Sequence, residues 1–172
     1  VNGKVKTVEV DMGAPILEAT KIPVSSSVKI EDKKVKAEVK VKNKKIELTC
    51  VSMGNPHAVT FVNDIKNFKV AEYGPILENA DIFPEKANIE FVEVVDKNNI
   101  KMRVWERGSG ETLACGTGAC SSVVASSLNG YTERKVNVQL LGGNLEIEWK
   151  PNNHVYMTGP AVTVFKGEWI DE

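Results

Sequence analysis

The sequence lacks a long apolar run and an excess of either charge, and both absences exclude classes of partner. The longest uncharged stretch, residues 112–132, contains Gly, Ser, Thr and Asn throughout, so it is not the continuous apolar span that a bilayer requires. Lys and Arg number 22 against 23 Asp and Glu, for a net charge of -1. Because this balance leaves no strong positive field, we expect neither a membrane nor a nucleic acid as a partner.

Cysteine is also scarce, and its arrangement indicates free thiols. The three cysteines, Cys50, Cys115 and Cys120, are an odd number without the spacing of a disulfide framework, which favours a reducing compartment, by default the cytoplasm. The sequence begins with Val1 rather than Met and shows no apolar signal segment at its start. We therefore expect a cytoplasmic protein and a chain that is part of a longer one.

Short runs of alternating apolar and polar residues predict a structure made mostly of strands. Three pairs of such runs are separated by turn residues and predict hairpins; they lie at 35–41 with 46–50, at 89–95 with 100–104, and at 136–140 with 145–149. Two shorter strands are expected at 155–158 and 162–165, on either side of Gly159-Pro160. Hairpins of this kind favour an antiparallel sheet or barrel.

Two segments predict helices, and the second is the more informative. The first spans Val70 to Asn79 with Pro75 inside it. The second, residues 116–129, carries no charge on any face and is followed by Gly130, a common helix stop. A helix without a charged face is usually buried all round. We therefore predict an α+β fold in which antiparallel strands form a barrel around a central buried helix.

Cys115 lies where a strand leads into this buried helix. Just before the first helical turn, free backbone N–H groups and the helix dipole favour a thiolate. Gly116 and Gly118 lack side chains, so the N–H groups of residues 116 to 118 are placed to receive a carboxylate. A base beside such donors suits removal of a proton α to a carboxylate. The alternative is an inert structural cysteine in a glycine-rich cap.

Glu106 is the second candidate acid or base. If Ile100, Met102 and Val104 face the core, alternation places Glu106 on the same face at the end of the strand. A carboxylate there needs a partner or a function, although it is equally compatible with exposure at the strand end. Arg107 has the opposite parity and is suited to bind a carboxylate with both arms of its guanidinium.

A third motif, Gly54-Asn55-Pro56-His57, predicts a tight turn that directs His57 from a rigid corner. Such a histidine is either a hydrogen-bonded structural residue or a group that tunes a neighbouring acid or base. Asn88 follows Phe83-Pro84 and on its own predicts only a turn.

The pattern of thiols, imidazoles and glycines favours no cofactor. His57, His154, Cys115 and Cys120 contain no pair with the close spacing of a structural zinc site. The segment 116–118 has only two glycines and lacks the flanking features of a dinucleotide site. We therefore expect neither a metal nor a bound nucleotide.

Taken together, the segments 54–57 and 106–119 resemble the two signature segments of the C-terminal half of the diaminopimelate epimerase family. Met12-Gly13-Ala14-Pro15, Gly74-Pro75-Ile76 and Tyr156-Met157-Thr158-Gly159 extend the resemblance along the chain. It implies two pseudo-symmetric domains, each a helix wrapped by strands, with the substrate between them. It also implies interconversion of LL- and meso-diaminopimelate without pyridoxal phosphate or metal, by one cysteine from each domain.

The resemblance assigns a role to each motif residue. Cys115 matches the cysteine of the second domain, and Glu106 and His57 match residues that assist the cysteines. The positions that match the substrate-binding residues of the family are Asn55, Asn88, Glu106, Arg107 and, through their backbone, Gly116 and Thr117.

One departure from the family concerns the other half of the site. The first catalytic cysteine of the family lies in Asn-Ala-Asp-Gly and Cys-Gly-Asn-Gly segments, and neither occurs here. We therefore expect residues 15–159 to form the C-terminal epimerase domain, with 1–14 and 160–172 crossing to an absent N-terminal domain. On this view the chain alone is inactive, and the family's tendency to dimerise implies a homodimer.

Two alternatives remain open. Another isomerase of the same fold, such as a proline racemase or a phenazine-biosynthesis-like isomerase, has a substrate without the distal carboxylate that Arg107, Asn55 and Asn88 would bind. The second alternative is a carboxylate-binding module without catalytic activity. A Cys115 thiol that stays unreactive up to high pH would favour it.

Overall fold

A computed structural model describes residues 5–25, 28–32 and 34–170. It consists mostly of strands with two α-helices, as predicted. The elements in chain order are β1 (Thr7–Asp11), β2 (Lys29–Glu31), β3 (Lys34–Val41), β4 (Lys44–Ser52), β5 (Pro56–Phe61), α1 (Val70–Glu78), β6 (Asn88–Asp96), β7 (Asn99–Glu106), β8 (Gly110–Thr112), α2 (Gly116–Leu128), β9 (Lys135–Leu140), β10 (Gly143–Trp149) and β11 (Val155–Pro160).

The strands form one curved sheet that is open at both ends. Its order is β1-β11-β10-β9-β7-β6-β5-β4-β3-β2, with β8 added beside β7. The predicted barrel is not confirmed, because within the described residues the edge strands β1 and β2 do not pair with each other. The sheet is also not wholly antiparallel. The pairs β5 with β6 and β7 with β9 are parallel, since each is joined through a helical crossover rather than a tight turn.

The three predicted hairpins are confirmed as β3-β4, β6-β7 and β9-β10. Their turns are tighter than predicted, because the strands extend into the expected loops. The first turn holds only Lys42 and Asn43, between the paired residues Val41 and Lys44. Lys42 adopts a positive φ of 54°, as two-residue hairpin turns commonly require.

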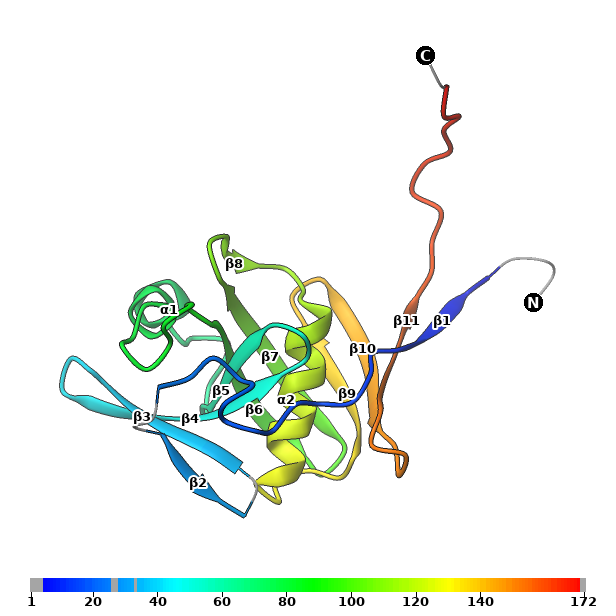
Figure 1. The fold of residues 1–172 in the computed structure, drawn as a ribbon. Coiled ribbons are helices and arrows are strands. Elements are labelled where there is room, and N and C mark those ends of the chain that lie inside the picture. Colours follow the sequence, from blue (N-terminus) through cyan, green and yellow to red (C-terminus); the bar gives the residue numbers. More distant parts are fainter. Residues whose placement is uncertain (1–4, 26–27, 33, 171–172) are drawn as a thin grey trace.

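The helix α2 lies in the concave side of the sheet, as predicted for the central helix (Figure 1). Nine of its residues are buried, and it contacts β4 to β7 and β9 to β11. Its uncharged sequence is explained by this position, since every face meets apolar strand residues. Gly130 follows the helix with a φ of +72°, which confirms the predicted stop.

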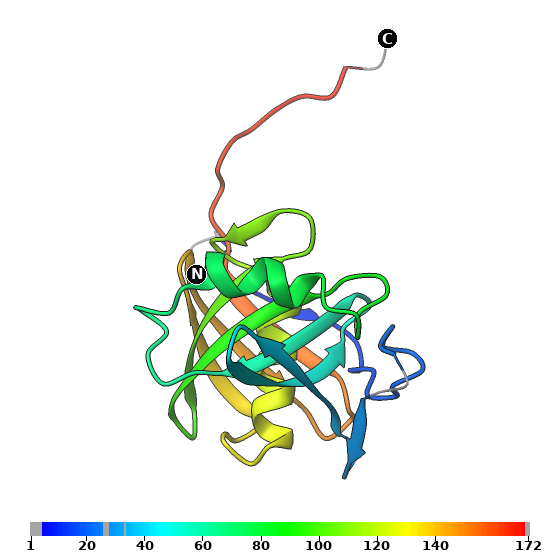
Figure 2. The same ribbon diagram turned by 90° about the vertical axis from the view of Figure 1, so that its left-hand side faces the viewer.

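The second helix, α1, lies on the other side of β6 and β7, so part of the sheet is buried on both faces (Figures 1 and 2). Ile89 and Phe91 of β6 pack in the cluster with α1, whereas Val92 packs in the cluster with α2. As a result, the first five residues of β6 are all buried, Glu90 among them, whereas Glu93 and Asp96 further along the strand reach solvent.

The strand predicted at 162–165 is wrong. β11 runs without a break through Gly159 to Pro160 and pairs with β1 and β10, but residues 161–170 form no helix or strand. The Ala161 N–H still donates to Lys6 O beside β1 at 2.9 Å, but the described residues after Ala161 join no strand of the sheet, and an unpaired strand cannot satisfy its backbone groups. This segment leads away from the sheet (Figure 1). Residues 1–4 of the predicted crossover 1–14 lie outside the described residues.

The helices do not provide a membrane span. Among the residues that the structure describes, none of the helices combines the length and apolar character needed to cross a bilayer.

Candidate active site

Cys115 is the N-cap residue of α2, as the sequence predicts. Its backbone is extended, with φ -140° and ψ 113°. The backbone N–H of Gly118 donates to Cys115 Sγ at 3.4 Å, and Thr117 Oγ1 lies 3.5 Å from the same sulfur. The sulfur thus accepts the hydrogen bond that the Gly118 N–H could have given to a ligand. The prediction offered three N–H groups, those of residues 116 to 118, to a carboxylate. Two remain, those of Gly116 and Thr117, because the first turn of a helix leaves them without intrahelical partners.

The expectation of a readily formed thiolate is wrong for this chain. Burial raises the pKa of the Cys115 thiol, and the carboxyl groups of Glu90 and Glu106 raise it further when they are ionised. The hydrogen bonds from Thr117 and Gly118 oppose this shift without cancelling it. The side chain is only 9% exposed, so loss of hydration outweighs the favourable helix N-terminus. At neutral pH, Cys115 is a thiol and hence a proton donor.

Alkylation of the thiol tests this result. We expect the rate of Cys115 alkylation by iodoacetamide to rise about tenfold per pH unit beyond neutrality. It should still be rising at the pH where the rate for free cysteine levels off, because a raised pKa moves thiolate formation to higher pH. Mass spectrometry of the modified chain measures the rate.

Cys115→Ser provides the background for this measurement. Burial raises the pKa of both Cys50 and Cys120 to about 12, so their contribution should be slow. If the Cys115 alkylation rate levelled off at a lower pH than the rate for free cysteine, the result would contradict the raised pKa.

His57 is buried in β5, immediately after the predicted turn. Gly54 adopts a φ of +94°, which explains why glycine precedes Asn55 and Pro56. The imidazole has no solvent exposure, and its Nε2 lies 2.9 Å from Asn55 Oδ1. Its Nδ1 lies 2.6 Å from Glu90 Oε1. The turn therefore positions His57 as predicted, but the ring faces the interior rather than an open corner.

Glu90, which the sequence reasoning missed, is the most unusual residue of the site. It lies in β6 with no solvent exposure, and its Oε2 has no hydrogen-bond partner in the described part of the chain. Burial raises the pKa of its carboxyl group against the opposing effect of His57. A signal was available: Glu90 is the one charged residue in the otherwise apolar run Ile89 to Val92.

Gly118 explains how these groups approach one another. A Cβ at this position would lie 2.8 Å from Glu90 Oε1 and 3.2 Å from Cys115 Sγ. The absence of a side chain lets the buried carboxyl group and the thiol share the space beside the first turn of α2. The glycine predicted to clear room for a ligand is thus used by the protein itself.

Glu106 lies at the end of β7 on the parity that the sequence predicts. Ile100, Met102 and Val104 are buried, and Glu106 is half-buried at the end of the series. Its Oε1 accepts a hydrogen bond from Thr112 Oγ1. Its charge raises the pKa of both Glu90 and Cys115, so it lies within electrostatic reach of the thiol while it keeps a share of solvent access.

Asn88 and Arg107 join the strands that carry the site. Asn88 Nδ2 donates to Pro56 O at 2.9 Å, and Asn88 Oδ1 accepts from the backbone N–H of Arg107, also at 2.9 Å. The Arg107 guanidinium donates to Glu85 O at 2.9 Å on the exposed rim. The structure therefore brings the predicted residues of β5, β6 and β7 together, with Arg107 at their margin.

The loop after β7 is held by a further buried carboxylate. Glu78 of α1 accepts from the Trp105 indole at 2.8 Å and from the Gly108 N–H at 3.1 Å. Gly108 and Gly110 have φ values of +76° and +85°, so this turn requires glycine at both positions. These contacts fix the direction in which Glu106 and Arg107 leave the strand.

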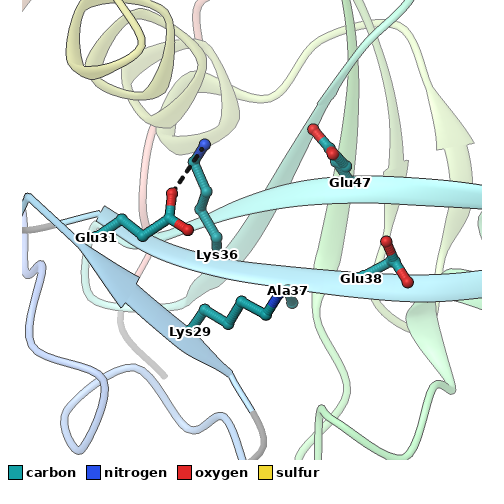
Figure 3. Close-up of a pocket in the computed structure, with 6 residues that line it drawn as sticks. All are labelled: Lys29, Glu31, Lys36, Ala37, Glu38 and Glu47. Atoms are coloured by element: carbon teal, nitrogen blue, oxygen red, sulfur yellow. Dashed lines mark ion pairs between the residues drawn. The ribbon is translucent and has the colours of Figure 1, made fainter.

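A separate surface hollow lies over β2, β3 and β4 (Figure 3). It is lined by Lys29, Glu31, Lys36, Ala37, Glu38 and Glu47. Lys36 and Glu31 form an ion pair across it at 3.5 Å. The hollow contains none of the motif residues, so its charged groups are explained as a solvated surface.

Comparison with known proteins identifies the family. The sequence profile described as diaminopimelate epimerase matches residues 49–164. A diaminopimelate epimerase of Acetivibrio thermocellus is 56% identical over 168 residues, which cover 97% of this chain and 59% of that protein. The chain belongs to the diaminopimelate epimerase family. The resemblance drawn from the motifs is thereby confirmed.

Other diaminopimelate epimerases match this chain over a similar share of their length. That of Methanococcus maripaludis is 55% identical, with 97% of this chain and 60% of that protein covered. That of Leptospira biflexa is 51% identical, with 97% and 59% covered. The chain therefore spans about 60% of the length of the curated relatives that it matches.

Solved structures share the fold at much lower sequence identity. A probable proline racemase from Agrobacterium radiobacter has a TM-score of 0.62 at 12% identity, covering 96% of this chain and 56% of that one. A hydroxyproline epimerase from Agrobacterium vitis has a TM-score of 0.59 at 12% identity, covering 93% and 51%. The fold of this diaminopimelate epimerase family member is thus shared with racemases and epimerases of other names.

Proposed function

We propose that the complete protein containing this chain interconverts LL- and meso-diaminopimelate by a two-thiol mechanism, with Cys115 as one acid/base catalyst. The observation that carries the proposal is the position of Cys115, at the N-terminus of the buried helix beside two free backbone N–H groups. Family membership supports the substrate, and the half-buried Glu106, whose charge acts on the thiol, supports proton transfer.

Different groups of the site bind the substrate carboxylate and transfer protons at the reacting carbon. The N–H groups of Gly116 and Thr117 hold the α-carboxylate, where negative charge builds up as the proton leaves. Cys115, a thiol at rest, donates a proton to one face of the carbanion. A thiolate from the remainder of the protein removes the original proton from the other face. The step leaves Cys115 as a thiolate and the opposite group as a thiol, so Cys115 is the base in the reverse direction. Before another forward turnover Cys115 regains a proton and the opposite thiol loses one, and the half-buried Glu106 links Cys115 to solvent for this exchange.

The distal half of the substrate explains the remaining motif residues. Diaminopimelate carries a second amino-acid group, whose carboxylate suits the Arg107 guanidinium at the rim. Asn55, just before β5, and Asn88, at the start of β6, add amide groups. A proline racemase of the same fold is the second candidate function, favoured by the solved neighbour with a TM-score of 0.62. Its substrate has no distal carboxylate, which leaves Arg107 without a role.

Exposed apolar side chains support an interface with the remainder of the protein. Val162, Val164 and Phe165 are between 79% and 85% exposed, and Val8 and Val10 of β1 are also exposed. Apolar residues gathered on one arm of a protein commonly mark an interaction site. We infer that this arm, formed by β1, β11 and the segment after it, packs against the domain that supplies the second cysteine.

Substrate assays of the complete protein test the function. We expect turnover of LL-diaminopimelate and none of L-proline, measured by deuterium incorporation from D2O at the α-carbon. Exchange with proline alone would favour the racemase alternative. Binding of diaminopimelate without exchange would favour a carboxylate-binding module.

The 172-residue chain by itself should not epimerise diaminopimelate. Cys50 and Cys120 are buried in the two cores and cannot replace the second catalyst. Circular dichroism of the purified chain confirms folding, and chiral chromatography after incubation with LL-diaminopimelate measures the product. Formation of the meso isomer above the blank, at any protein concentration, would overturn the two-thiol assignment.

A further inference from the structure

The side chains of Glu90 and His57 form a buried pair that shares one proton. Both are fully buried, and Glu90 Oε1 lies 2.6 Å from His57 Nδ1. On the other side of the ring, Nε2 lies 2.9 Å from Asn55 Oδ1. A carbonyl oxygen only accepts hydrogen bonds, so Nε2 carries a hydrogen. The pair is therefore either a carboxylic acid with a neutral imidazole or a carboxylate with an imidazolium.

The surroundings of Glu90 favour the neutral form. Its Oε2 has no hydrogen-bond partner in the described part of the chain, and a buried ionised oxygen without a partner is costly. The titratable groups that face Glu90 are His57 from β5, Glu106 from β7 and Cys115 at the start of α2. Glu106 is negative when ionised and opposes a charge on Glu90, whereas Cys115, a thiol at neutral pH, supplies no positive charge to offset one. The carboxyl group therefore keeps its proton, as acids in apolar sites do.

We propose that Glu90 is a positioning residue for the substrate side of the site. As a neutral acid it donates a hydrogen bond to His57 Nδ1, which holds the ring hydrogen on Nε2 against Asn55 Oδ1. The Asn55 carbonyl is then occupied, and its NH2 group is the end left to meet the substrate. Glu90 thus selects, through His57, a donor that suits a substrate carboxylate.

The inference rests on the proposed function only where it assigns Asn55 to substrate binding. Without a donor at position 90, the hydrogen on the ring is free to move to Nδ1. Nε2 then becomes an acceptor, and the Asn55 amide turns to present its NH2 to the ring. The substrate would meet a carbonyl oxygen, which repels a carboxylate. The predicted loss is therefore one of binding rather than of proton transfer.

Nitrogen NMR of the chain labelled with 15N-histidine tests the proton positions. The chain contains two histidines, so His154→Asn assigns the signals. We expect His57 to show a protonated Nε2 and an unprotonated Nδ1 near neutral pH. Glu90→Gln should leave this pattern unchanged, because the glutamine NH2 also donates to Nδ1. Two protonated ring nitrogens in the unsubstituted chain, or a hydrogen on Nδ1, would overturn the proposal.

Kinetics of the complete protein test the consequence for the substrate. Glu90→Leu should raise the KM for diaminopimelate about tenfold, the loss of one hydrogen bond to a charged group, with kcat nearly unchanged. Glu90→Gln should restore the KM. Glu93→Gln, on the same strand but bonded to Lys101 and Ile65, is the matched control and should have no effect.

The two readouts separate the possible failures. If Glu90→Leu does not fold, the comparison of Glu90→Gln with the unsubstituted chain still decides the proton positions. If the complete protein has no epimerase activity, the proposed function fails while the histidine spectrum still confirms or overturns the pairing. A normal KM in a folded Glu90→Leu variant would show that Glu90 has no positioning role.

Discussion

Replacing Cys115 by serine is expected to lower kcat/KM of the complete protein for diaminopimelate by about 1,000-fold, the usual contribution of a placed acid/base group. A serine hydroxyl retains the N-cap hydrogen bond to the backbone N–H of Gly118. It is a far weaker acid than a thiol and cannot exchange the α proton at a useful rate. Because the cap is retained, the variant should fold normally. Exchange of the α hydrogen in D2O, followed by NMR, measures the loss.

The control for this prediction is Cys120→Ala. Cys120 is fully buried in α2, one and a half turns from Cys115, and burial raises its pKa to about 12. It takes no part in the proposed proton transfer, so this variant should keep activity within a few-fold of the unsubstituted protein. If Cys115→Ser retained similar activity, the thiol would not be the acid/base group. If both variants lost activity equally, the effect would lie in the packing of the helix.

Replacing Gly74 by alanine is expected to destabilise the chain by about 1 kcal/mol or more, even though alanine has the higher helix propensity. A Cβ on Gly74 would lie 2.4 Å from Trp105 Cγ and 2.7 Å from Trp105 Cβ. The gain in propensity is about 1 kcal/mol, whereas overpacking costs about 1–3 kcal/mol and occasionally more. Overpacking prevails because the indole is fixed by its hydrogen bond to Glu78 and because Trp105 Cβ moves only with the strand.

Urea unfolding of Gly74→Ala, Trp105→Ala and the double variant measures this effect. Trp105→Ala removes Cγ and Cδ2, the two atoms that the new methyl group would approach most closely. When Trp105 is alanine, Gly74→Ala should therefore cost less, and the two changes should not be additive. Equal costs in both backgrounds would show that the close approach of α1 and β7 is not responsible. The clash also bears on function, since Trp105 directly precedes Glu106.

The positions of two motif residues, Cys115 and Glu106, could be predicted from their neighbours in the sequence. Cys115 was predicted at a helix N-terminus from the glycines that follow it, and Glu106 on the core side of β7 from alternation alone. Both predictions are confirmed, because capping and strand parity depend on residues only a few positions away. The barrel and the strand at 162–165 were not confirmed, because strand pairing depends on segments distant in the sequence.

Glu90 escaped prediction for the same reason. Its burial results from β5 and β6 pairing in parallel through the α1 crossover, with α2 packed over the face that Glu90 shares with His57. The residues beside Glu90 in the sequence do not indicate that β5 and α2 pack against it. The raised pKa of Cys115 is likewise a property of the assembled site, since it depends on burial and on two carboxyl groups from other strands.

Features that depend on near neighbours can be predicted from the sequence: three hairpins, an uncharged helix with a cysteine at its N-terminus, and motifs that identify the family. How these features interact depends on the packing of segments that are distant in the sequence. This packing buried a carboxyl group against His57, occupied the Gly118 N–H with the thiol, and kept Cys115 protonated at neutral pH. The physical reason is that hydrogen bonds and loss of hydration depend on distance in space, which only long-range packing specifies.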